Sequence, residues 1–127
     1  MKAVTACVTL LAIMLAAHHG RAADKVTKAT KAPMVMTATW YGGTHDGRRM
    51  ANGRIFRKND RTVIASTKFP LGTKIEVKSL TTGRTLIGRV SDRGLFGRNH
   101  LDLSEAGAVW LGFREAGRTK LRVTVIN

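Results

Sequence analysis

Cysteine is almost absent from this chain of 127 residues, because the only one is Cys7 in the apolar N-terminal run. Beyond that run there is no thiol, so the folded part can form neither a disulfide nor a thiolate nucleophile. A lipid-modified cysteine would stand at the end of such a run, whereas most of this run follows Cys7. We therefore expect a protein that is not a lipoprotein.

Metal ligands and cofactor-binding motifs are also scarce. Beyond residue 22 the only histidines are His45 and His100, which do not have the paired spacing of metal ligands. Phosphate-binding loops of the Walker or dinucleotide type are absent, and no nucleophile turn supports a Ser-His-Asp triad. The sequence thus predicts no metal and no cofactor.

Acidic residues are few, with 8 Asp and Glu against 22 Lys and Arg. Beyond residue 22, 20 basic and 8 acidic residues leave a net charge of +12. A field of that strength implies an anionic partner. Nucleic acid, anionic lipid and peptidoglycan with free carboxylates all fit, so charge alone does not choose among them.

Long apolar runs are limited to residues 3–17, which follow the basic Lys2. Gly20 and Ala22 are small residues at the positions that a signal-peptide cleavage site requires. The run is shorter than the roughly 20 residues of a membrane-spanning helix. We expect residues 1–22 to be a signal peptide and the protein to be periplasmic or secreted, with no integral membrane segment after cleavage; an uncleaved anchor is the alternative. Export argues against nucleic acid as the partner.

The remaining chain divides into a leader and one domain. Residues 23–33 are polar, with lysines at intervals and no large apolar side chain, so we expect a flexible basic leader over residues 23–34. Residues 35–127 are enough for a single small domain, which we expect to be monomeric.

Short strands dominate the pattern of this domain. Runs rich in β-branched or alternating apolar residues predict strands at 35–41, 62–67, 73–80, 85–90 and 120–127, with Gly83 supplying the positive φ of a hairpin loop. A helical spacing over 103–113, with Ser104 as N-cap and Gly112 or Gly117 at the end, predicts one helix with Trp110 in the core. Because closure removes unprotected edges, the fold class expected is mainly β, a small six-stranded barrel with one short helix.

The sequence contains, in order, the motifs ATWYG at 38–42, GRRMANG at 47–53, FPLGT at 69–73, DRG at 92–94 and LDLS at 101–104. Together they resemble the successive motifs of the RlpA-like double-psi β-barrel family. The enzymatic members of that family are peptidoglycan lytic transglycosylases that prefer glycan strands without stem peptides. The resemblance covers about residues 36–126. It implies a double-psi barrel whose groove binds glycan strands.

The resemblance also implies which residues carry the chemistry. Enzymatic members have a Glu directly after the Ala-Asn-Gly segment, a His before the Pro-containing turn, and the Asp of Asp-Arg-Gly. Here the first two positions are Arg54 and Ser66, and Asp92 alone matches. One carboxyl group suffices in principle. It can protonate the leaving glycosidic oxygen and then take a proton from the muramyl 6-hydroxyl as the anhydro ring closes, and no water has to be activated.

We therefore take Asp92 as the candidate catalytic residue and Tyr41, Arg54, Ser66 and Arg93 as candidate substrate-binding residues. A structural role for Asp92, as an acceptor of backbone hydrogen bonds at its turn, is the alternative. The titratable side chains of His45 and Asp46 lie nearby in the sequence and could replace the missing groups.

Other residues near the helix start are expected to be structural. Asp102 and Ser104 fit the start of the helix, and Glu105 is a first-turn acid that suits the helix dipole. Of Trp40 and Tyr41, adjacent on a strand, one is expected to face the core and the other the solvent.

Three functions remain open at this point. The leading prediction is an endolytic peptidoglycan lytic transglycosylase. The alternative is a non-catalytic, expansin-like module that binds peptidoglycan or another polysaccharide. An exported binder of nucleic acid rests on charge alone.

Overall fold

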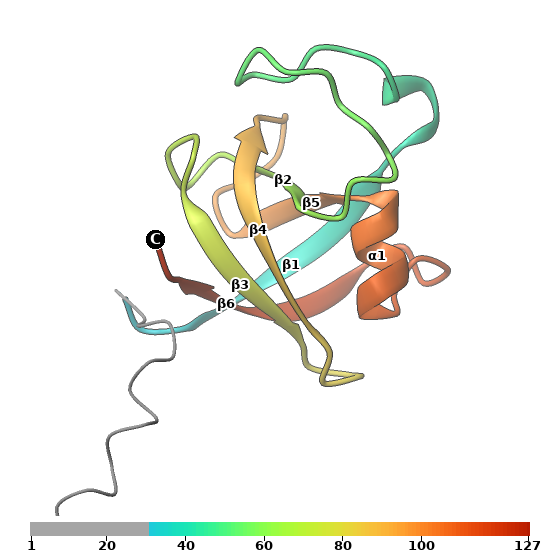
Figure 1. Cartoon of the computed structure of the whole chain (residues 1–127). Helices are drawn as coiled ribbons and strands as arrows, with labels where there is room; N and C mark the ends of the chain where they lie inside the picture. Colours follow the sequence, from blue (N-terminus) through green and yellow to red (C-terminus); the bar gives the residue numbers. More distant parts are fainter. Residues whose placement is uncertain (1–30) are drawn as a thin grey trace, which may run out of the picture.

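The computed structural model describes residues 31–127, which form one barrel with a helix on its side (Figure 1). The strands are β1 (Met34–Tyr41), β2 (Val63–Ser66), β3 (Lys74–Ser79), β4 (Thr85–Asp92), β5 (His100–Ser104) and β6 (Thr119–Val125). A 3-10 turn, η3 (Gly43–His45), follows β1, and the helix is α1 (Glu105–Leu111). The expectation of a six-stranded barrel with one short helix is confirmed.

The six strands close into a barrel in the order β1-β5-β2-β4-β3-β6. Two of the neighbouring pairs are parallel, β1 with β5 and β2 with β4, and the other four are antiparallel. Closure leaves no free strand edge in the barrel, which a domain of this size could not otherwise protect. The arrangement puts β1, β5, β2 and β4 side by side, and these four strands carry the residues discussed below.

Alternation along the strands builds the core. Most of the residues that alternate inward along the barrel strands are apolar and buried, and Ser66 and Ser79 are buried as well. The largest fully buried apolar residues of the strands are Met36, Ile64, Ile75, Val77, Val90, Leu101, Leu103, Leu121 and Val123. The outward residues of the same strands are therefore free to be polar.

The helix begins and ends as its caps predict. Ser104 accepts a hydrogen bond from the backbone N–H of Gly107, and Gly112 ends the helix in the left-handed conformation at φ 87°. The expectation that Trp110 lies in the core is wrong, because its side chain is 39% exposed. The buried face of α1 instead consists of Gly107, Ala108 and Leu111.

Residues 100–104, which include Asp102 and Leu103 of the expected helical stretch, form the strand β5. Leu101 and Leu103 are buried and alternate with the half-buried His100 and Asp102. This period of two is typical of a strand. The expectation that Asp102 belongs to the helix start is therefore wrong, and its side chain lies on the outer face of the barrel.

The segment between β1 and β2 arches over one end of the barrel (Figure 1). Met50 and Phe56 of this segment form a second apolar cluster with Val63, and Tyr41 packs against it. The rings of Tyr41 and Phe56 stack with centroids 4.4 Å apart. Trp40 packs on the main core instead, so both rings are half-buried, and the expected split between core and solvent is wrong.

The close approach of β4 to the start of β2 requires a glycine at position 88. A Cβ atom on Gly88 would lie 2.7 Å from the carbonyl oxygen of Thr62 and 2.9 Å from Cδ1 of Ile64. We expect Gly88→Ala to lower the free energy of unfolding by about 1–3 kcal/mol, as overpacking does. Urea unfolding measures this loss.

Gly97→Ala is the matched control for that substitution. A Cβ atom on Gly97 meets nothing within 4 Å, so its stability should change by less than about 0.5 kcal/mol. Equal losses in both variants would show that the approach of β4 to β2 is not constraining.

The signal peptide expected at 1–22, and the part of the basic leader before residue 31, lie outside the described residues. Within residues 31–127, no helix is long and apolar enough to cross a membrane.

Candidate active site

Two aspartates flank one small residue on the outer face of the barrel. In the strand register Ala65 of β2 is paired with Asp92 of β4 on one side and with Asp102 of β5 on the other. On the far side of β5, Asp102 is paired with Thr39 of β1. A shift of register between Ile64 and Ala65 brings Asp92 into this row. Four neighbouring strands thus place two carboxyl groups in one row, with Ala65 of β2 between them.

The carboxylate of Asp92 accepts three hydrogen bonds. Its Oδ1 accepts from the backbone N–H groups of Ala51, at 2.9 Å, and Arg93, at 2.9 Å. Its Oδ2 accepts from the hydroxyl of Tyr41 at 3.0 Å. These donors tie the arching segment, the turn after β4 and the end of β1 to one carboxylate, and Asp92 acts only as an acceptor in this arrangement.

The hydroxyl of Tyr41 donates the hydrogen bond to Oδ2 of Asp92. Burial raises the pKa of the Tyr41 hydroxyl well above its ordinary value, and the negative charge of Asp92 raises it further. The hydroxyl therefore stays protonated at any physiological pH. It supplies a fixed donor beside the carboxylate pair.

Asp102 is in a different environment. Its Oδ1 accepts a hydrogen bond of 2.9 Å from the hydroxyl of Thr39. Burial raises the pKa of the Asp102 carboxyl, and the charge of Asp92 adds to this, whereas Thr39, His100 and His45 act in the opposite direction. A carboxyl group with a raised pKa retains its proton to a higher pH than an ordinary one.

A short chain of hydrogen bonds leads from Asp102 to His100. The Thr39 hydroxyl, which donates to Oδ1 of Asp102, also lies 2.7 Å from Nε2 of His100. Burial lowers the pKa of His100, so its ring tends to stay neutral. Thr39 and His100 therefore position Asp102.

The arrangement can do acid–base chemistry. A partly desolvated carboxyl group with a raised pKa, such as that of Asp102, suits a proton donor. Asp92, in contrast, accepts three hydrogen bonds through its carboxylate. The sequence analysis singled out Asp92 as a candidate but not Asp102, Thr39 or His100; the alternation of 100–103 could have shown that His100 and Asp102 lie on a strand, but not what they contact.

Not all sequence-predicted residues meet at this cluster. Ser66 is fully buried, and its Oγ accepts from the backbone N–H groups of Lys68 and Phe69. Arg93 is exposed, and its Nη1 donates to the carbonyl oxygens of Ser66 and Phe69. Ser66 therefore shapes the turn that Arg93 holds, while Tyr41 and the backbone of Arg93 contact Asp92 directly.

His45 and Asp46 have different contacts in the structure. The ring of His45 meets that of Tyr41 edge to face at 5.4 Å, so it borders the cluster. Asp46 accepts the backbone N–H of Lys58 at 2.8 Å and holds the arching segment. Among residues 31–127, no group of three or more His, Cys, Asp or Glu side chains could hold a metal ion.

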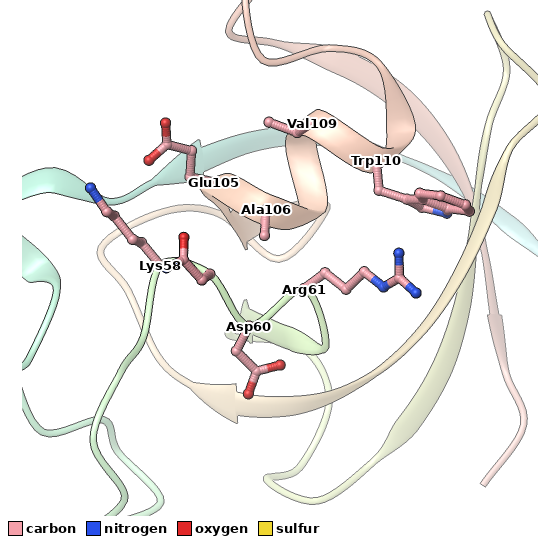
Figure 2. A pocket seen from close by; sticks show the side chains of 8 residues that line it. Lys58, Asp60, Arg61, Glu105, Ala106, Val109 and Trp110 are labelled. Atoms are coloured by element: carbon pink, nitrogen blue, oxygen red, sulfur yellow. The ribbon is translucent and has the colours of Figure 1, made fainter.

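Two hollows lie near the cluster. One, of about 700 Å³, separates α1 from the segment 58–61, and Figure 2 shows Trp110 and Arg61 at one end of it and Lys58 and Glu105 at the other. The second, of about 740 Å³, lies between the tip of the arching segment and β4 and includes Arg54. Neither hollow is lined by Asp92 or Asp102.

Comparison with known proteins identifies relatives of this chain. A family model described as lytic transglycolase matches residues 34–123. The chain is 45% identical over 92 residues to a "probable endolytic peptidoglycan transglycosylase RlpA" of Aquifex aeolicus, covering 71% of this chain and 40% of that protein. It is 38% identical over 95 residues to the endolytic peptidoglycan transglycosylase RlpA of Pseudomonas aeruginosa, covering 74% and 28%.

A solved structure shares the fold. The Streptomyces papain inhibitor superposes with a TM-score of 0.63 at 21% identity, covering 78% of this chain and 97% of that one. The chain spans less than half the length of the two transglycosylase relatives. By its family match and its sequence identity to those relatives, the chain belongs to the RlpA-like double-psi β-barrel family.

Proposed function

We propose that this barrel is a peptidoglycan lytic transglycosylase domain that cleaves within glycan strands lacking stem peptides. The observation that carries the proposal is the pair of aspartates across Ala65, one rich in hydrogen-bond donors and one with a raised pKa. The description of the family and the names of two relatives support the same reaction.

In this proposal Asp102 transfers the proton in both steps. Its carboxyl group first protonates the glycosidic oxygen, and the bond from that oxygen to C1 of the muramyl sugar breaks. The resulting carboxylate then accepts the proton of the 6-hydroxyl of the same sugar while that oxygen bonds to C1. The anhydro ring closes without water, and Asp102 regains its proton.

Asp92 is the negative partner in the same proposal. Its carboxylate, held by Ala51, Arg93 and Tyr41, would stabilise the positive charge that develops at the sugar ring. Tyr41 and Arg93 are proposed to contact the glycan, because the former borders the carboxylate and the latter is exposed next to it.

The alternative is a glycan-binding module without catalysis, of the expansin type. Arg54 and Ser66 favour it, because they stand where enzymatic members of the family carry Glu and His. The test is incubation with peptide-free glycan strands and mass spectrometry of the products. Anhydromuramyl ends support the enzyme, and binding to sacculi without new ends supports the module.

Export to the periplasm or medium completes the proposal, because the substrate lies there. We expect the exported protein to begin at Ala23, since Gly20 and Ala22 occupy the small-residue positions before it. Intact mass of the protein recovered outside the cytoplasm measures this. A chain that retains residues 1–22, or that carries lipid on Cys7, would contradict it.

A further inference from the structure

The hollow beside the catalytic pair is cationic. Its lining includes the side chains of Arg54 and Arg89 against a single carboxylate, that of Asp60. Oδ1 of Asp60 already accepts hydrogen bonds from the N–H and hydroxyl of Thr62. Nη1 of Arg89 donates to the carbonyl oxygen of Gly72, while the guanidinium of Arg54 has no hydrogen-bond partner among residues 31–127. An arginine whose guanidinium donors are free therefore belongs to the lining of this hollow.

The hollow is also joined to the catalytic cluster. Ala51, Asn52 and Ser91 line it. The backbone N–H of Ala51 donates to Asp92, and that of Asn52 donates to the carbonyl oxygen of Ser91 at 3.1 Å. The tip of the arching segment thus separates Asp92, to which Ala51 donates, from the hollow that Ala51 and Asn52 line. A glycan strand lying across this tip would meet both.

The apolar part of the lining suits a sugar ring. Ile55 and Leu71 are 38% and 40% exposed, and both line the hollow. Its volume of about 740 Å³ lies in the range of small-molecule sites. Apolar surface beside a guanidinium matches a sugar that carries a carboxylate, because the fork of donors binds that group bidentately.

The other hollow does not offer the same charge. Glu105 and Asp60 line it together with Lys58 and Arg61, so its charges balance. The indole of Trp110, which could otherwise stack on a ligand, has guanidinium carbons of two arginines 4.5 and 5.2 Å from its centroid.

We propose that the hollow lined by Arg54 and Arg89 binds the free lactyl carboxylate of a muramyl sugar next to the cleaved bond. That carboxylate exists only where the stem peptide is absent, because the peptide is attached through it. The site would therefore select peptide-free strands by charge. This inference rests on the proposed function for its substrate and deepens it.

The test compares two forms of one ligand. Peptide-free glycan strands are used as such or with their carboxylates converted to methylamides, and the dissociation constants are measured in an Asp102→Asn background so that no strand is consumed. We expect the parent protein to prefer the carboxylate form about tenfold. Arg54→Gln should remove most of this preference, and Arg54→Glu should reverse it.

Arg122→Gln is the matched control, because Arg122 is an exposed arginine of β6 that lies outside the hollow. It removes the same charge and should leave the preference unchanged. An undiminished preference in Arg54→Gln, or no preference in the parent protein, overturns the inference. A misfolded variant would lose affinity for both forms alike, so the ratio of the two dissociation constants distinguishes misfolding from the loss of the site. Arg54→Lys, which keeps the charge but not the fork of donors, is a second test variant, and we expect it to have a reduced preference.

Failure of this inference is distinguishable from failure of the proposed function. If the protein forms anhydromuramyl ends but has no preference for the carboxylate form, the carboxylate site alone is contradicted. A preference that depends on Arg54, in a protein that forms no anhydro ends, would leave the site standing and remove the enzyme.

Discussion

Asp102→Asn should abolish most of the formation of anhydromuramyl ends from peptide-free glycan strands. The amide keeps an acceptor for the Thr39 hydroxyl but cannot donate a carboxylic proton or take one back. Removal of a general acid–base group lowers rates by about 10²–10⁴-fold. Glu115→Gln, which neutralises an exposed acid far from the pair, is the control and should keep the full rate.

The same variant should gain stability relative to the parent protein as the pH rises. Because burial raises the folded-state pKa of Asp102, the stability that this group contributes is fully present below its unfolded pKa and is lost as the pH rises through the folded one. Asparagine avoids that loss. Urea unfolding at about pH 3 and about pH 7, which lie on either side of an ordinary Asp pKa of about 3.9, measures the difference. If Asp102→Asn instead loses stability relative to the parent protein as the pH rises, Asp102 is held ionised and is not the proton donor.

Asp92→Asn should also reduce product formation by about two orders of magnitude or more, while glycan binding persists. The side-chain oxygen that remains can accept the backbone hydrogen bonds of Ala51 and Arg93, so the turn should survive. What is lost is the negative charge beside Asp102. Rates of anhydro-end formation and affinities for the strands, measured together, separate the two effects.

Asp46→Asn is the matched control for that variant. Asp46 also accepts a backbone N–H, that of Lys58, but lies outside the pair. It should leave turnover nearly unchanged. Turnover that survives in Asp92→Asn would move the chemistry away from Asp92, and a variant that fails to fold would assign Asp92 the structural role of holding its turn.

The fold could be predicted from the sequence because its signals are local. Alternation in 73–80 and 120–127 and the positive φ of Gly83, observed at 80°, each depend on a few adjacent residues. The strand β5 was missed because Leu101 and Leu103 run directly into the helical spacing of α1. Periodicity alone could not show where a period of two gives way to one of 3.6.

The site was only half predictable for a different reason. Asp92 stands in a recognisable motif, whereas Asp102 acquires its importance from the neighbours that the barrel gives it, Thr39 from 63 residues away and Asp92 across Ala65. The exposed indole of Trp110 was missed similarly, since its Nε1–H donates to the carbonyl oxygen of Thr85 on β4. Contacts of this kind arise from the closed topology and leave no trace in sequence spacing.

The central claim, that two aspartates across Ala65 close an anhydro ring without water, is tested most directly by the nature of the new glycan ends. Peptide-free strands are incubated with the protein in heavy-oxygen water, and the products are analysed by mass spectrometry. The account predicts anhydromuramyl ends that contain no heavy oxygen, formed by the parent protein and nearly absent with Asp102→Asn. Reducing ends labelled with heavy oxygen would mean hydrolysis, and no new ends at all would mean a binding module; either result would contradict the account.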